Sequence, residues 1–109
     1  MSSNRALVVF VCMVAAAHAA AAERVACPSS VRVTDGRHVL DNASVFDGPP
    51  SQMASLQPLS VGKMDHWDVA GSDAYLVCRY KGTERIITLH AKGTTTCMAG
   101  NKPFRANCE

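Results

Sequence analysis

The residues best suited to metal chemistry lie together at positions 64–68, in the order Met-Asp-His-Trp-Asp. A thioether, a carboxylate and an imidazole are ligands that copper or zinc accepts. His66 is the imidazole of this run, and neither His38 nor His90 stands at a spacing that is diagnostic of a shared metal site. We therefore expect no metal ligand here, and we interpret the run as a loop that Trp67 anchors to the core.

Four of the five cysteines follow the N-terminal apolar segment, and they are Cys27, Cys78, Cys97 and Cys108. Their separations of 51, 19 and 11 residues include no Cys-x-x-Cys and fit no zinc finger or ribbon. Their number is even, which predicts two disulfides if the chain is exported to an oxidising compartment, with zinc binding or redox exchange as the alternative. Of the three possible connectivities we prefer Cys27–Cys78 with Cys97–Cys108. The first ties the N-terminal end to the most strand-like segment, and the second closes a short C-terminal loop.

Arrangements typical of a catalytic nucleophile are absent from the sequence. There is no Gly-x-Ser-x-Gly motif. Asp47 precedes Gly48 and two prolines, a context in which aspartate commonly caps a turn by accepting hydrogen bonds from the following backbone N–H groups. We therefore expect no enzyme activity, no catalytic or cofactor-binding residue and no cofactor.

Binding is the function that these residues permit most readily. Arg79, Tyr80, Lys81 and Arg85 surround a predicted hairpin turn, so three cations and an aromatic ring are expected at one tip. Such a tip suits an acidic cleft on a partner, although an ordinary solvated turn is the alternative interpretation. We predict a non-enzymatic periplasmic binding or interaction module, whose partner is a protein or a cell-envelope component. The alternative is a small metal-binding or redox protein of the periplasm.

The first 22 residues are predicted to be a secretory signal peptide. Arg5 supplies positive charge, residues 6–14 are apolar, and the small residues 15–22 offer several cleavage points. We expect cleavage after Ala22, with cleavage after Ala19 as the alternative, and hence a periplasmic or secreted protein without a membrane span in its mature part. Removing Arg5 reduces the 11 Lys and Arg residues to ten against 9 acidic residues, a balance that argues against nucleic-acid binding.

Residues 23–109 are expected to form one mainly β domain stapled by two disulfides. Its predicted architecture is a small antiparallel sheet or sandwich with one short helix after Pro50, at residues 51–57. Residues 59–70 are poorly patterned: Gly62, Lys63 and Asp65 predict a loop, and an alternating run begins with Trp67 and Val69. Alternation, strand-forming residues and flanking turn signals predict strands at 30–34, 38–40, 44–46, 74–80, 85–90, 94–97 and 104–108.

Several segments recur in the same order in a known family. They are Cys27-Pro28, the Phe-Asp-Gly-Pro-Pro of residues 46–50, the Cys-Arg-Tyr-Lys-Gly-Thr of residues 78–83, the Gly-Thr-Thr-Thr-Cys of residues 93–97 and Cys108. The chain thereby resembles a family of small uncharacterised secreted proteins of Gram-negative bacteria. The resemblance covers nearly all of the chain after residue 22, and it implies an exported protein with a framework of four cysteines.

Overall fold

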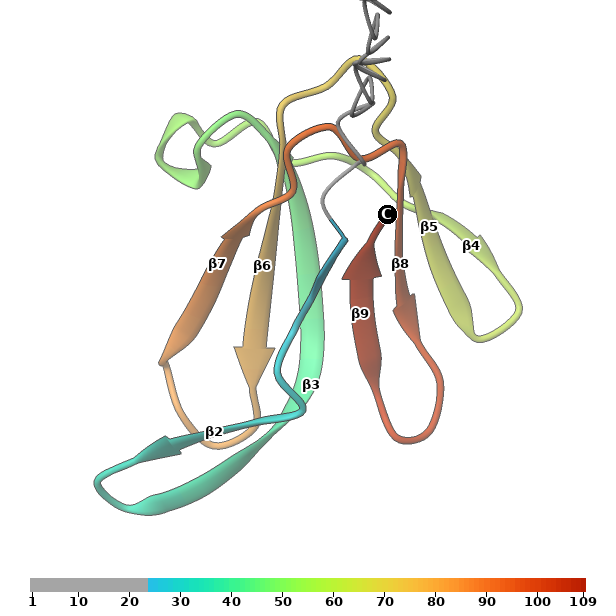
Figure 1. Cartoon of the computed structure of the whole chain (residues 1–109). Coiled ribbons are helices and arrows are strands. Elements are labelled where there is room, and N and C mark those ends of the chain that lie inside the picture. The colour runs from blue at the N-terminus through green and yellow to red at the C-terminus, as the bar shows by residue number, and fades with distance from the viewer. Residues whose placement is uncertain (1–23) are drawn as a thin grey trace, which may run out of the picture.

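The computed structural model describes residues 24–109, and the predicted signal peptide lies outside these residues. Two antiparallel sheets form there, a five-stranded sheet in the order β1-β9-β8-β5-β4 and a four-stranded sheet in the order β2-β3-β6-β7 (Figure 1). The predicted mainly β, antiparallel fold is therefore confirmed. The elements are β1 (Val25–Ala26), β2 (Ser30–Val33), β3 (Gly36–Asp47), η1 (Pro50–Gln52), β4 (Leu59–Val61), β5 (Met64–Asp68), β6 (Ala74–Tyr80), β7 (Ile86–His90), β8 (Thr96–Gly100) and β9 (Arg105–Cys108).

The four-stranded sheet is built around β6, the segment with the strongest strand pattern in the sequence. Strands β3 and β7 flank it, and its alternate residues Leu76 and Cys78 are completely buried. Residues 38–40 and 44–46, predicted as separate strands, belong to the single strand β3. The polar pair at 41–42 does not end the strand, because the register with β6 shifts between Leu40 and Asn42 and the chain then continues its pairing.

The five-stranded sheet contains the main correction to the predicted elements. Residues 59–66 are not a loop, because β4 and β5 form a hairpin around Gly62, whose φ of +63° suits a tight turn. The alternation was hidden because Leu59 and Val61 point to solvent, with exposed fractions of 70% and 58%. Strand β8 also lies later than predicted, at Thr96–Gly100 instead of 94–97.

The core lies between the two sheets. Its apolar side chains include Val45 and Leu76 from the four-stranded sheet and Trp67 and Ala99 from the five-stranded sheet. The indole of Trp67 is 4% exposed, and its N–H donates to the Leu56 carbonyl oxygen at 3.1 Å. The prediction that Trp67 anchors its segment to the core is confirmed.

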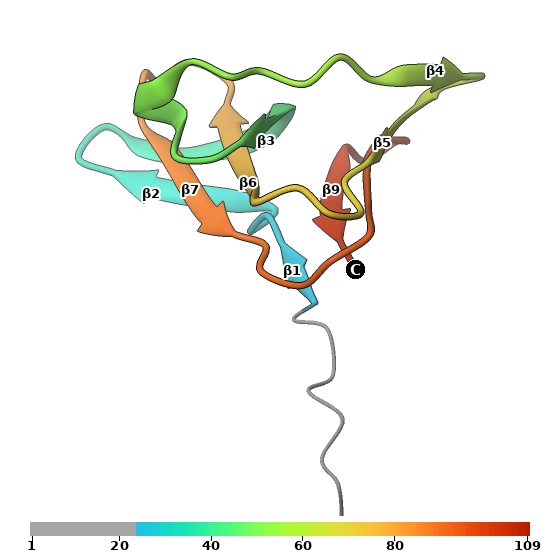
Figure 2. The same cartoon turned by 90° about the horizontal axis from the view of Figure 1, so that it is seen from above.

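The helix predicted at residues 51–57 is a single 3-10 turn, η1, that ends at Met53 in a left-handed conformation with φ of 59°. The chain then pairs with β3, since the Leu56 N–H donates to the Val45 carbonyl oxygen at 2.8 Å. Figure 2 shows the same segment passing from η1 across to β4, so it joins the two sheets. Within residues 24–109, no helix has the length and apolar character needed to cross a membrane.

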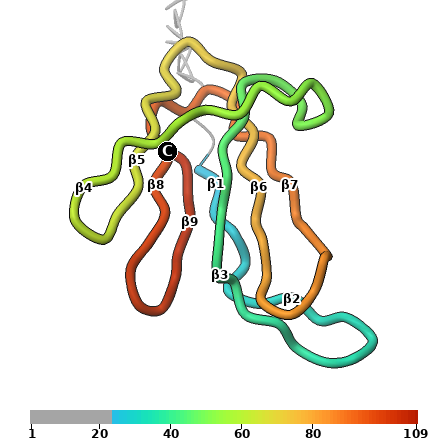
Figure 3. The backbone as a smooth tube through the Cα atoms, turned by 180° about the vertical axis from the view of Figure 1, so that it is seen from behind, coloured from blue at the N-terminus to red at the C-terminus, as the bar shows by residue number. Residues whose placement is uncertain are grey.

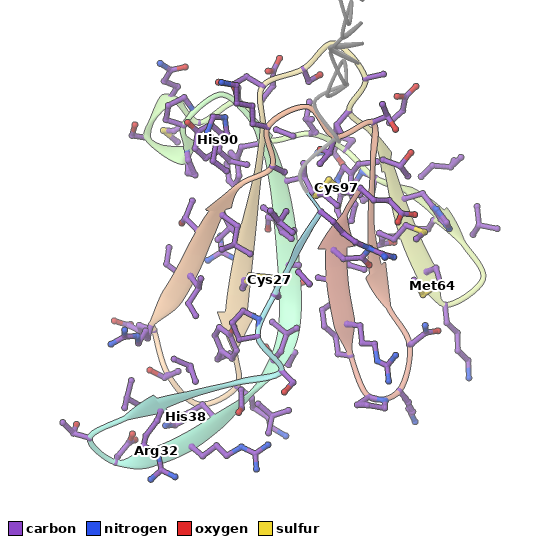
Figure 4. All side chains as sticks on the ribbon, viewed as in Figure 1. Cys27, Arg32, His38, Met64, His90 and Cys97 are labelled. Carbon is purple, nitrogen blue, oxygen red and sulfur yellow. A yellow bond between two sulfur atoms is a disulfide. The ribbon has the colours of Figure 1, made fainter. Side chains whose placement is uncertain are left out.

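Both predicted disulfides are present. Cys27, directly after β1, bonds to Cys78 on β6, so this bridge links the N-terminal end of the five-stranded sheet to the centre of the other sheet. Cys97 and Cys108 are direct partners on the adjacent strands β8 and β9, so their bridge lies within one sheet. Cys27 and Cys97 are labelled in Figure 4. A domain this small buries limited apolar surface, and such bridges commonly supply part of its stability.

Candidate interaction surface

The hairpin between β6 and β7 places the four predicted surface residues differently. Lys81 and Arg85 are exposed in the connection, where the Arg85 N–H donates to the Thr83 hydroxyl at 3.2 Å. Arg79 lies half-buried on the outward face of β6, opposite Ile86 on β7. Of the three predicted cations, Lys81 and Arg85 are therefore fully available to a partner and Arg79 partly so.

Tyr80 faces the opposite way, and the prediction that its ring is exposed at the tip is wrong. Its side chain is on the core face of β6 and only 4% exposed, because residue 80 shares the face of Leu76 and Cys78 in the two-residue period of a strand. The Tyr80 hydroxyl donates to the Pro28 carbonyl oxygen at 2.8 Å, and burial raises its pKa above 10.0. Tyr80 thus holds residues 27–29 in place and is not itself a contact surface.

The tertiary structure adds a second hairpin to this tip. The turns of β2–β3 and β6–β7 lie at the same end of the molecule (Figure 3), and the Lys81 N–H donates to the Val39 carbonyl oxygen at 2.9 Å. Arg32 and Arg37 are exposed and directly opposite each other in the β2–β3 pair. We call Arg32, Arg37, Lys81 and Arg85 the cationic hairpin surface. No carboxylate of residues 24–109 forms an ion pair with any of these four cations.

His38 joins the two hairpins. Its Nε2 lies 2.8 Å from the Asp35 carboxylate and its Nδ1 lies 2.7 Å from the Lys81 carbonyl oxygen. Both neighbours are acceptors, so only an imidazolium, which donates from both nitrogens, satisfies this geometry. The hydrogen bond with Asp35, followed by that with the Lys81 carbonyl, raises the pKa of His38 above 6.5. The same hydrogen bond lowers the pKa of Asp35 below 3.8. Figure 4 labels His38 together with Arg32 on this hairpin.

These additional residues were missed for a specific reason. The alternation of residues 30–34 and the following Asp35-Gly36 predict a turn, but a two-residue turn at Asp35-Gly36 would place Arg32 opposite Val39. The turn lies one residue earlier, at Thr34-Asp35, and this shift places Arg32 opposite Arg37. Nothing in the local sequence indicates that this hairpin lies against Lys81, 43 residues from His38.

A hollow of about 380 Å³ opens beside the same N-terminal segment. Its lining comes from the beginning of the described chain and from β9, and it consists of Arg24, Ala26, Cys27, Ser29, Phe104, Arg105, Ala106 and Asn107. Residues 27–29, which we call the strap, form one wall and continue into β2 of the cationic hairpin surface. The hollow and this surface are therefore adjacent along the chain.

The residues with metal or redox chemistry do not assemble into a site. Met64, His66 and Asp68 share one face of β5, whereas Asp65 lies on the other face and accepts from the Ser60 hydroxyl at 2.6 Å. Within residues 24–109, no three His, Cys, Asp or Glu side chains are grouped closely enough to hold a metal ion. All four cysteines after residue 24 are in disulfides, which leaves no thiol there for metal binding.

Asp47 and His90 belong to one structural cluster. Asp47 was predicted to accept from the N–H groups that directly follow it. It accepts instead from the N–H of Asp73 at 2.9 Å. Asp73 in turn lies 2.6 Å from His90 Nε2, and the His90 ring stacks on Tyr75 with centroids 4.3 Å apart. Within the described chain no hydroxyl or thiol hydrogen-bonds to His90, so this pair ties the 71–73 turn to β7 and lacks a nucleophile.

Comparison with protein families supplies the identity that these features leave open. Residues 35–109 match the family described as type VI secretion system Tli immunity protein. Comparison with curated proteins and with solved structures found no match. The matched residues include β3 to β9, the bridge Cys97–Cys108, and both hairpins of the cationic hairpin surface except β2. They span more than half of the chain, and the chain therefore belongs to the type VI secretion system Tli immunity protein family.

Proposed function

We propose that this protein protects its cell by binding a type VI secretion effector in the periplasm and blocking it without doing chemistry of its own. The observation that carries the proposal is the family match over residues 35–109. Two further features support it. Two disulfides suit an oxidising compartment, and the predicted signal peptide supplies a route to it.

The test is protection of growth. Each type VI effector of the producing bacterium is expressed, directed to the periplasm, in a host that also expresses the full chain. We expect one effector to stop growth and the full chain to restore it, whereas a chain that lacks residues 1–22 does not. Mass spectrometry of the protective protein should show a chain that begins at Glu23. If the full chain restores growth against none of these effectors, the proposal is wrong.

We further propose that the effector contacts the cationic hairpin surface, with Arg79 at its margin. Unpaired exposed cations speed association with an acidic protein surface, and their contribution weakens as salt is added. The hydrogen bonds of His38 hold the two hairpins together, so the four cations are presented in a fixed arrangement. This arrangement fits a partner with an acidic surface.

Charge reversal tests this contact. Lys81→Glu combined with Arg85→Glu should slow association with the protective effector by about tenfold at low salt. Lys92→Glu is the control for the single variant Lys81→Glu. Lys92 is also an exposed cation, and it lies in the turn after β7, at the other end of that strand. Equal effects of Lys81→Glu and Lys92→Glu on the association rate would contradict this placement.

A further inference from the structure

We infer that the hollow between the strap and β9 holds a carboxylate side chain of the effector, next to the Arg105 guanidinium. The inference rests on the proposed function and names a second contact of the same partner. Arg105 is exposed at the edge of the hollow, and no carboxylate of residues 24–109 pairs with it. The polar groups Ser29 and Asn107 and the ring of Phe104 complete the lining.

The chemistry of the lining favours an anion. Two guanidinium groups line the hollow, and no acidic residue does. A guanidinium presents a planar set of donors that matches a carboxylate. The structure contains one such contact already, because Arg24 Nη2 lies 3.1 Å from the Glu109 carboxylate. One arginine of the lining, Arg24, thus already pairs with a carboxylate. The other, Arg105, has no carboxylate partner among residues 24–109.

The hollow has fixed walls. The Cys27 N–H donates to the Ala106 carbonyl oxygen at 2.9 Å, and the Cys27 sulfur is bonded to Cys78. Tyr80 binds the carbonyl of Pro28, and the Ser29 carbonyl accepts from the Leu40 N–H at 2.9 Å. A site whose walls are already ordered loses less conformational entropy when a ligand binds.

The surroundings of the hollow fit a protein ligand. Asn107 is opposite Met98, Met98 is opposite His66, and His66 is opposite Leu59 in consecutive strand pairs. Cross-strand partners lie on the same face of a sheet, so this outward face carries the partly exposed Met98 on the strand next to Asn107 and the exposed Leu59 two strands further on. Methionine and arginine are enriched in protein interfaces. The occupant we assign is therefore an acidic side chain on the effector surface, with neighbouring apolar residues covering Met98 and Leu59.

The experiment measures binding of the protective effector to the full chain purified from the periplasm. Arg105→Glu should weaken the equilibrium affinity by about 10-fold to 100-fold, because a charge-assisted hydrogen bond is replaced by repulsion. Lys102→Glu is the matched control. It makes the same change of charge three residues away, at an exposed position in the β8–β9 turn that does not line the hollow, and it should change the affinity by less than threefold. Circular dichroism and the melting temperature verify that both variants fold.

The outcomes separate the two proposals. If the effector binds the wild-type chain but Arg105→Glu and Lys102→Glu weaken it equally, the hollow has been assigned wrongly and the proposed function stands. If an acidic residue of the effector, changed to lysine, restores binding specifically to Arg105→Glu, the hollow is assigned correctly. If no type VI effector binds the wild-type chain, the proposed function and this inference both fail.

Discussion

Replacing Gly100 by alanine tests how closely β8 approaches β5. Gly100 lies opposite Met64 in the five-stranded sheet and has a φ of +142°, which side-chain-bearing residues rarely adopt. A Cβ added there would overlap the Lys63 carbonyl oxygen and would stand 2.9 Å from the Met64 sulfur. The Lys63 carbonyl oxygen belongs to the backbone and cannot rotate away as a flexible side chain can. The two strands would therefore have to separate.

Gly36 is the matched control for the conformational part of this cost. Its φ is +129°, and a Cβ added there would meet nothing within 4 Å. Gly36→Ala should therefore cost about 1–3 kcal/mol, the usual range for a strained backbone conformation. Gly100→Ala should cost about 1–3 kcal/mol more, because forced overlap in a packed region adds a penalty of that size.

Urea unfolding followed by the fluorescence of Trp67 measures both changes. This side chain is the single tryptophan of the chain, and it is 4% exposed in the folded protein. With a urea dependence of about 1 kcal/mol per molar for a small domain, the Gly100→Ala midpoint should lie about 1–3 M below that of Gly36→Ala. Equal midpoints for the two variants would refute the close approach of β8 to the β4–β5 turn.

Three further predictions follow from particular contacts. Replacing Cys27 and Cys78 together by alanine should lower the unfolding free energy by about 4 kcal/mol in denaturant titrations, because their bridge closes a loop with a separation of 51 residues; a loss below about 1 kcal/mol would contradict the loop argument. The pair of His38 with Asp35 should stabilise the hairpins fully between pH 3.8 and 6.5, and this contribution should disappear as the pH rises through the raised pKa of His38 or falls through the lowered pKa of Asp35. In Asp35→Asn the His38 pKa, measured by NMR titration, should fall back towards 6.5. An unchanged pKa would show that the hydrogen bond with Asp35 does not raise the pKa of His38. Glu109→Gln should tighten effector binding by about twofold to fivefold, since it releases an arginine of the hollow from an exposed ion pair; weaker binding would argue that this ion pair itself builds the site.

Local signals predicted most of the elements correctly. The strand at 74–80 contains Tyr, Leu, Val and Cys, and the turns after it are marked by glycine, so its hairpin with β7 could be predicted without tertiary information. The same holds for β2 and β9, although the turn after β2 is at Thr34-Asp35, one residue before the Asp35-Gly36 pair that predicted it. The β4–β5 hairpin could not be predicted in this way, because Leu59 and Val61 face solvent and the expected apolar-inside pattern is absent.

The candidate site was predicted only in part, and Tyr80 shows why. Its residue type suggested a contact at a hairpin tip, but the two-residue period of β6 places it on the buried face with Cys78. Because Leu76, Val77 and Cys78 are all apolar and all buried, the local pattern does not show which alternate residues of this strand face the core between the sheets.

What the sequence alone determined is the class of protein and its covalent framework. Composition, alternation and four well-separated cysteines indicate a small β-rich domain with two disulfides, because strand propensity and bridge formation depend on residue types and on short-range order. Only the tertiary structure decided which surface the chain presents. Residues such as His38 and Lys81 are 43 positions apart, and their contact depends on how the register of β3 against β6 brings two hairpins together. The hollow likewise exists because strand pairing and Tyr80 hold the strap against β9, a contact that no local pattern encodes.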